Sequence, residues 1–187
     1  MGDEKGLPGL GPEYEPLSFT CPNGSEDPVF VIRGGLKPGD IGDIVRVHGI
    51  VFGKELGFGH RFEAYVATPL SEFVLTGNPA RERIWIAECG GGFAGCAALV
   101  RQTPGKACIR WLITEPIFRG RGLGKMLLKK AVNFGMERKY KSVFLWTLSD
   151  LTHAQNLFAC CGFEKTAERP IVFLGHNRLE EKYEFHY

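Results

Sequence analysis

One amphipathic helix stands out in the pattern of hydrophobic and polar positions. Its apolar residues fall at i, i+4, i+8 and i+11, on a single helical face: Leu123, Leu127, Ala131 and Phe134. Lys125, Lys129 and Asn133 fall on the opposite face. The mostly apolar run 108–114 (CIRWLIT) precedes this helix and predicts a strand. The chain therefore passes from a strand into a helix through a short segment that contains several glycines.

Two further helices are expected nearer the N-terminus. Pro38-Gly39-Asp40 is a helix-start signal with Asp40 as the N-cap, and residues 53–60 are expected to break the helix that follows. The apolar stripe of this helix consists of Ile41, Val45, His48 and Phe52. We expect His48 to be a hydrogen-bonded, partly buried side chain rather than a substrate contact. The second helix covers 61–75, and Pro69 inside it is expected to kink or split it.

The remaining chain is mostly strand-like. Residues 83–89 and 93–101 predict a hairpin around three glycines. The nearly continuous apolar run 141–148 predicts a central strand that is buried on both faces. A short helix is expected to start at 149–152 and to run through Cys160. The other expected strands cover residues 30–33, residue 163 onward, 171–174 and 181–185.

This order of elements predicts the fold class. It runs strand, two helices, three antiparallel strands, helix, strand, helix and last strands. We therefore expect an α+β fold, an α/β sandwich with a mixed, mostly antiparallel central sheet and flanking helices. Residues 1–28 are rich in Gly, Pro and Glu and are predicted to be a flexible N-terminal tail, and residues 29–187 are predicted to form one domain.

Composition and charge exclude several classes of protein. A formal net charge of +2 is too small for a dedicated nucleic-acid binder. No apolar run approaches the roughly 20 residues that span a bilayer, and no signal peptide is visible, so we expect no membrane partner. The six cysteines lack paired C-x-x-C spacing, so we expect no metal site and a reducing cytoplasm.

The glycine-rich segment 119–125 (RGRGLGK) has the features of an anion-binding site. Unpaired N–H groups and the helix dipole give a helix N-terminus partial positive charge, and glycines let an anion approach the backbone closely. Arg119, Arg121 and Lys125 add full positive charges. The segment is no P-loop, because Met126 follows the lysine where Ser or Thr is required. It is no Rossmann fingerprint either, because the glycines run G-x-G-x-G late in the chain.

The pattern R-x-x-G-x-G after a strand resembles the pyrophosphate-binding motif of the GNAT superfamily of N-acetyltransferases. The resemblance covers roughly residues 30–187 and is sharpest at 109–116 (IRWLITEP), 119–124 and 157–163 (LFACCGF). Residues 145–152 (LWTLSDLT) and 179–183 (LEEKY) are similar to a narrower group, the acetyltransferase half of bacterial fusions with a MarR-type regulator. We expect a stand-alone version of that half, without the DNA-binding module.

The resemblance implies that acetyl-CoA is the co-substrate and lies between the fourth and fifth strands. It places the pantetheine on Leu112, Ile113 and Thr114. The pyrophosphate would lie on the N–H groups of the anion loop, which consists of Arg119, Gly120, Arg121, Gly122, Leu123, Gly124 and Lys125. Ser149, Thr152 and Asn156 are the candidates to replace a missing asparagine contact, because Leu151 stands at the position of that asparagine.

The catalytic groups depart from the family pattern. Phe158 stands where the family often has a tyrosine acid, so a tyrosine acid is excluded there. For the base, the sequence offers Glu115, which we weigh slightly ahead, and Glu88, although either carboxylate is more simply solvated. Glu55, Glu63 and His60 are candidates to attract a cationic amine, and Trp111 and Trp146 are most simply core residues.

Two functions remain open from the sequence. The first is transfer of an acetyl group from acetyl-CoA to an amine, which is either a small molecule or a protein amine. The second is a CoA-binding sensor or interaction module without transferase activity. The first is favoured. A homodimer is possible through the alternating last strand.

Overall fold

The computed structural model describes residues 28–187, so the predicted tail lies, except for Pro28, outside the described residues. The strands are β1 (Val31–Gly34), β2 (Arg83–Cys89), β3 (Gly92–Thr103), β4 (Lys106–Thr114), β5 (Ser142–Leu148), β6 (Glu164–Phe173) and β7 (His176–His186). The helices are α1 (Asp40–Leu56), α2 (Arg61–Thr76), the 3-10 turn η1 (Pro116–Phe118), α3 (Leu123–Glu137) and α4 (Thr152–Cys160). The predicted order of elements is confirmed.

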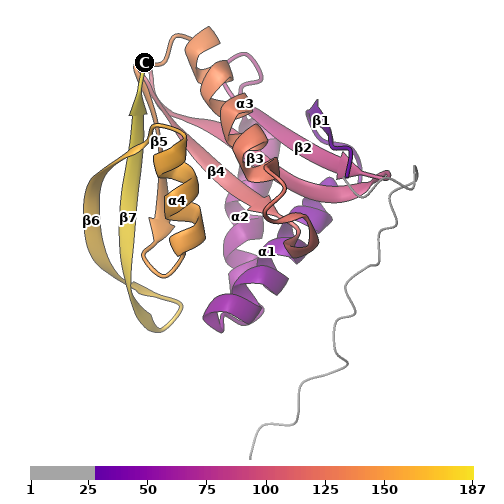
Figure 1. Cartoon of the computed structure of the whole chain (residues 1–187), viewed down its shortest axis with the longest axis vertical. Coiled ribbons are helices and arrows are strands. Elements are labelled where there is room, and N and C mark those ends of the chain that lie inside the picture. The colour runs from indigo at the N-terminus through magenta and orange to yellow at the C-terminus, as the bar shows by residue number, and fades with distance from the viewer. Residues whose placement is uncertain (1–27) are drawn as a thin grey trace, which may run out of the picture.

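A single seven-stranded sheet forms the centre of the molecule, with the order β1-β2-β3-β4-β5-β7-β6. All neighbouring strands are antiparallel except β4 and β5, which are parallel. Helices α3 and α4 lie on one face of the sheet, and α1 and α2 lie on the other (Figure 1). The predicted α+β sandwich is therefore confirmed.

Strands β4 and β5 separate soon after they meet. They pair only at Lys106↔Ser142, Ala107↔Val143 and Cys108↔Phe144, although β4 continues to Thr114 and β5 to Leu148. The β3–β4 register slips within the same region, between Cys96 and Ala98. Two residues of β4, Trp111 and Leu112, lie there opposite Ala97 alone, and Trp111 has a φ of +50°. A bulge bends a strand and interrupts its pairing, which leaves a gap in the sheet between β4 and β5.

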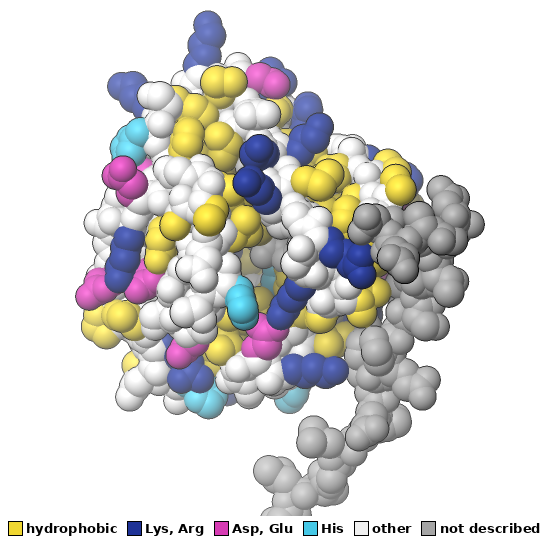
Figure 2. Space-filling view, in the orientation of Figure 1, with side chains coloured by type: hydrophobic (Ala, Val, Ile, Leu, Met, Phe, Trp, Pro, Cys, Tyr) yellow, Lys and Arg dark blue, Asp and Glu magenta, His cyan; other side chains and the backbone are white. Residues whose placement is uncertain are grey.

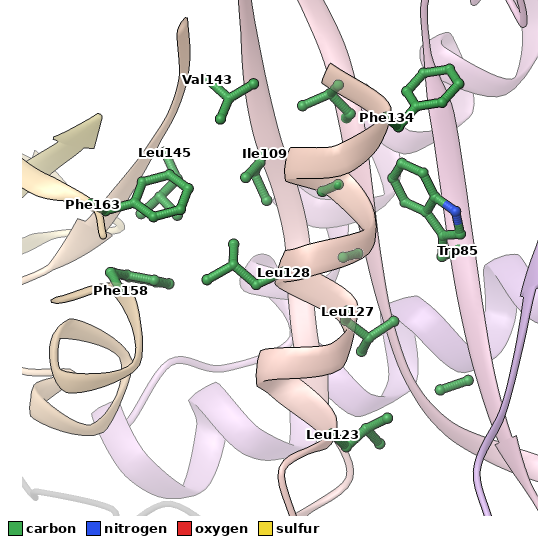
Figure 3. Close-up of a cluster of buried hydrophobic side chains, with 14 of the residues drawn as sticks. Trp85, Ile109, Leu123, Leu127, Leu128, Phe134, Val143, Leu145, Phe158 and Phe163 are labelled. Atoms are coloured by element: carbon green, nitrogen blue, oxygen red, sulfur yellow. The ribbon is translucent and has the colours of Figure 1, made fainter. Parts of the chain in front are cut away.

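The larger core cluster lies between the sheet and α3 (Figure 3). The predicted helical face is confirmed, since Leu123, Leu127, Ala131 and Phe134 are all buried. In Figure 3, Leu128 lies on the side of α3 that faces Phe158. The second cluster fills the space between the opposite face of the sheet and helices α1 and α2.

Helix α1 differs from the prediction at both ends and in its buried face. Its N-cap is Gly39, whose φ of +101° suits glycine, while Asp40 is the first helical residue. The helix continues past Gly53 to Leu56. Besides Asp40, its buried residues are Ile44, Val47, His48 and Val51, so the face is rotated from the predicted stripe. Apolar residues at successive positions made more than one face possible.

Two other predictions are wrong. Helix α2 runs unbroken through Pro69, because Phe62, Val66 and Leu70 are buried on both sides of the proline and hold the two halves together. Residues 171–174 form no separate strand, since β6 runs from Glu164 to Phe173 through Pro170. A proline is tolerated there because β6 is an edge strand. None of the described helices is long and apolar enough to cross a membrane.

Candidate active site

A cavity of about 470 Å³ lies at the gap between β4 and β5 and has walls from both faces of the sheet. The wall on the side of α3 and α4 consists of Ile109, Leu112, Leu145, Ala154 and Phe158. The face of the molecule that carries these helices is hollowed near its centre, and Lys and Arg side chains border the hollow (Figure 2). The cavity therefore connects the two sides of the sheet.

Aromatic side chains line the wall on the side of α1 and α2, among them Phe52, Phe62, Tyr65, Trp111, Trp146 and Phe173. Phe52 stacks on Phe62 with their ring centroids 4.5 Å apart, and Tyr65 meets Phe173 edge-on at 4.7 Å. Trp146 is not a core residue, since it is only partly buried and borders the cavity. Trp111 is buried, and it also borders the cavity. This wall suits a flat, apolar group.

His48 is the polar member of this wall that comes from α1. Its Nδ1 lies 2.7 Å from the carbonyl oxygen of Ile44. Because a carbonyl can only accept, Nδ1 carries the proton and Nε2 is the unprotonated acceptor. No described residue donates a hydrogen bond to Nε2. Burial lowers the pKa of His48 to about 4, so the imidazole is neutral near pH 7.

The anion loop lies at the N-terminus of α3, as predicted. Gly120 and Gly122 have φ values of +74° and +79°, and a Cβ atom on either one would meet nothing within 4 Å. Gly122 is the N-cap and offers no side-chain acceptor to the first-turn N–H groups. Gly124 lies against α4, since its Cβ would stand 3.2 Å from Leu157. The loop thus has exposed backbone donors and open space, which fits an anion such as a pyrophosphate.

The charged side chains of the loop differ in their surroundings. The Arg119 guanidinium forms an ion pair with Glu55 at the end of α1. Arg121 and Lys125 are exposed. Burial raises the pKa of the Cys161 thiol, and the charge of nearby Lys125 offsets part of this rise. The positive charge of Arg119 is therefore shared with a carboxylate in this structure.

The other predicted cofactor residues lie around the cavity rather than all inside it. Of these residues, Leu112 lines the cavity. Ile113 is buried against the α1–α2 cluster, and Thr114 pairs with Gly95 of β3. The Ser149 N–H donates to the carbonyl oxygen of Leu179. Asn156 is exposed on α4.

The carboxylates predicted as bases are held in ion pairs. Glu115 is buried, and its Oε1 lies 2.9 Å from a guanidinium nitrogen of Arg46. Glu88 accepts from Arg33 at 2.8 Å, and this bond lowers its pKa. Neither carboxylate lines the cavity. The acceptor-side candidates Glu55, Glu63 and His60 do not line it either.

Comparison with known proteins assigns the family. The profile of the Acetyltransferase (GNAT) family matches residues 54–163, more than half of the chain. The chain belongs to this family. Both the β4–β5 gap and the anion loop fall inside the matched region of this GNAT chain.

Two curated relatives share part of their length with this GNAT chain. N-acetylaspartate synthetase of Danio rerio is 29% identical over 92 residues, which are 49% of this chain and 33% of that protein. N-acetyltransferase 8F1 of Rattus norvegicus is 27% identical over 140 residues, which are 68% of this chain and 63% of that protein. The chain thus spans about one third and about two thirds of these relatives.

Solved structures agree with the fold of this GNAT chain. The ribosomal-protein-alanine N-acetyltransferase of Brucella melitensis superposes with a TM-score of 0.68 at 16% identity, covering 84% of this chain and 99% of that one. A Salmonella typhimurium protein solved with its cofactor acetyl-CoA superposes with a TM-score of 0.62 at 17% identity, covering 84% and 93%. At sequence identities of 16% and 17%, these similarities show that the chains share a fold and nothing more.

Sequence reasoning did not single out three charged residues of the cavity wall, Arg110, Arg169 and Glu180. Arg169 and Glu180 face each other across the β6–β7 pair, so only the register reveals them. Arg110 had a local signal, since it is the one charged residue of the apolar run 108–114. No local pattern in the sequence could have revealed the unprotonated nitrogen of His48, because the position of this side chain depends on which face of α1 packs on the sheet.

Proposed function

We propose that this chain transfers the acetyl group of acetyl-CoA to an amine. The observation that supports this best is the cavity at the β4–β5 gap, with the anion loop of α3 on one side of the sheet and an aromatic wall on the other. Such a cavity lets a thioester and an amine meet from opposite faces, which is the arrangement that direct transfer requires.

The anion loop, residues 119–125, is the proposed site of the pyrophosphate, and Leu112, Ile113 and Thr114 are the proposed contacts of the pantetheine. Exposed first-turn N–H groups at Gly122 and the open space beside it support the loop assignment. Ser149, Thr152 and Asn156 stay predictions for further contacts. Acetyl-CoA supplies an activated acyl group, so this chain has to orient the thioester, exclude water and move one proton.

That proton leaves the amine nitrogen when the new C–N bond forms, and two groups are candidates to take it. Glu115 is the candidate from the sequence, but its carboxylate is paired with Arg46 outside the cavity. His48 has an unprotonated Nε2 and lines the cavity. We therefore propose His48 as the group that accepts this proton, with Glu115 as the alternative.

Phe158, which stands where the family often has a tyrosine acid, has no proton to give to the leaving thiolate. Phe158 lies in the cavity wall with 4% of its surface exposed, and its ring packs 5.5 Å from that of Tyr183. We propose that the thiolate departs without a side-chain acid at this position and takes its proton from the imidazolium of His48 or from water. The C–S bond breaks as the amide forms, so charge and protons balance.

We also propose a cellular location and an oligomeric state. The resemblance to the acetyltransferase half of MarR-type fusions supports a bacterial, cytoplasmic protein. Strand β7 is covered by β6, so a homodimer that extends the sheet would use an edge strand, β1 or β6. Size-exclusion chromatography with light scattering tests the dimer.

Calorimetric titration with acetyl-CoA tests the cofactor site. We expect the wild type to bind and Gly122→Glu to bind at least about 100-fold more weakly, because two unit charges 4 Å apart repel by about 4 kcal/mol near a protein surface. Gly91→Glu is the matched control, since Gly91 also has a positive φ, +83°, with nothing within 4 Å of its Cβ. It lies in the β2–β3 turn and should bind like the wild type.

The outcomes separate the two functions that the sequence left open. Binding by the wild type together with release of free thiol in the presence of an amine supports the transferase. Binding without thiol release for any amine supports a CoA-binding module. If the wild type does not bind at low salt, the anion loop is not a cofactor site and the proposal is wrong.

A further inference from the structure

Arg110 places a positive charge in the part of the cavity opposite the anion loop. It pairs with Ala98 of β3, whose side chain belongs to the cluster under α1 and α2. Paired residues of adjacent strands point to the same face of a sheet, so Arg110 lies on that face too. The anion loop begins α3, which covers the other face. Arg110 is therefore placed for the acceptor and not for the cofactor phosphates.

The guanidinium of Arg110 has no acidic partner among residues 28–187. Its contact is with the ring of Trp111, whose centroid lies 5.1 Å from Cζ. Arg169, the other arginine of the wall, donates from Nε and a terminal nitrogen to Glu180 at 2.9 and 2.7 Å. Its Cζ also lies 4.2 Å from the centre of the Trp146 ring. Arg169 is therefore satisfied within the protein, whereas Arg110 keeps its fork of N–H donors for a ligand.

The charges of the cavity wall favour an acceptor that is not a polycation. The cavity lining contains two arginines, Arg110 and Arg169, and one carboxylate, Glu180, while His48 is neutral. A half-buried guanidinium without an anionic partner is poorly solvated, and a carboxylate meets its geometry with two parallel hydrogen bonds. The aromatic side chains around it supply a surface for an apolar group.

We propose that the acceptor is an amine that also carries a carboxylate, an amino acid with an apolar or aromatic side chain, and that Arg110 binds the carboxylate. This inference rests on the proposed function. The carboxylate lies against Arg110, the apolar side chain packs on the aromatic wall, and the amine nitrogen is left to face the gap in the sheet. The cavity selects against polyamines, because they bring positive charge and no anion to the Arg110 guanidinium.

Three acceptors with the same apolar body test the proposal: L-phenylalanine, L-phenylalaninamide and phenethylamine. Thiol release from acetyl-CoA gives kcat/KM for each, and we expect the wild type to prefer phenylalanine by about 10- to 100-fold, the range of a charge-assisted hydrogen bond. Arg110→Gln should lose this factor for phenylalanine and change the other two less than about twofold. Arg101→Gln, which removes an exposed arginine of β3 outside the cavity, is the control and should keep the preference.

A binding readout keeps the test independent of turnover. Trp111 and Trp146 line the cavity, so phenylalanine should change the tryptophan fluorescence of the wild type and not that of Arg110→Gln. Binding of phenylalanine with no thiol release would support the Arg110 site and refute the proposed transfer. Equal losses for all three acceptors in Arg110→Gln, or a wild type that prefers phenethylamine to phenylalanine, would overturn the proposal for Arg110.

Discussion

Burial of His48 should make the stability of the protein depend on pH. The residue is 5% exposed, and burial lowers its pKa from 6.5 to about 4. In the unfolded chain His48 is protonated below about pH 6.5, whereas in the folded chain it stays neutral down to about pH 4. The contribution of neutral His48 to the free energy of unfolding is fully present above pH 6.5. It is lost as the pH falls from about 6.5 to about 4.

The size of the effect follows from the shift. About 2.5 pKa units at 1.36 kcal/mol each give a total loss on the order of 3 kcal/mol below pH 4. Between about pH 7.5 and pH 5, roughly 2 kcal/mol of the free energy of unfolding should be lost through His48 alone. This is a large fraction of the stability of an ordinary domain.

Urea denaturation of the wild type and of His48→Gln at about pH 7.5, 6 and 5 measures this contribution. Glutamine cannot titrate, so the free-energy difference between the two proteins should change by about 2 kcal/mol in favour of the variant as the pH falls. His153→Gln is the control, because His153 is exposed on α4 and its removal should leave the wild-type pH dependence unchanged. If the wild type and His48→Gln lose stability in parallel over this range, the reasoning from burial is wrong.

Three further predictions concern the core, a buried carboxylate and the proposed base. Leu128→Ala removes a fully buried side chain between α3 and the sheet and should cost about 2–5 kcal/mol in urea denaturation at neutral pH. Burial raises the pKa of Glu184, but hydrogen bonds from Lys106, Lys182 and Ser142 outweigh it and hold the pKa at about 2. The wild type should therefore lose stability as the pH falls from about 4.5 towards 2, and Glu184→Gln should show little of this loss. For the base, His48→Gln should lower kcat for thiol release by about 100-fold and Glu115→Gln by less than about tenfold, and the reverse order would favour Glu115.

Elements with local signals could be predicted from the sequence. The face of α3, the hairpin of β2 and β3 and the glycine turn at Gly122 depend on residues close together in the chain. The anion loop was thus predictable as a structure, while its occupant is a proposal.

The buried face of α1 was not predictable, because apolar residues occur on several sides of that helix. Isoleucine, valine and phenylalanine recur at close spacing from Ile41 to Phe52. Periodicity alone therefore allowed more than one face of the helix to be the buried one. The sheet decided between them by packing Ile44 and Val47. Pro69 failed as a helix breaker for a similar reason, since tertiary contacts outweigh a local preference.

The chemistry of the cavity depends on distant pairings that no local pattern contains. Glu115 seemed available in the sequence, but Arg46, 69 positions away, holds its carboxylate. Arg169 is likewise neutralised by Glu180 across a strand pair. Arg110 has an equally charged side chain, yet no described acidic residue reaches it, and the β4 bulge at Trp111 puts an aromatic ring beside it. The partners of a charged side chain in the folded sheet therefore decide whether its charge is structural or is left for a ligand. For this reason we assign the acceptor contact to Arg110 and not to Glu115.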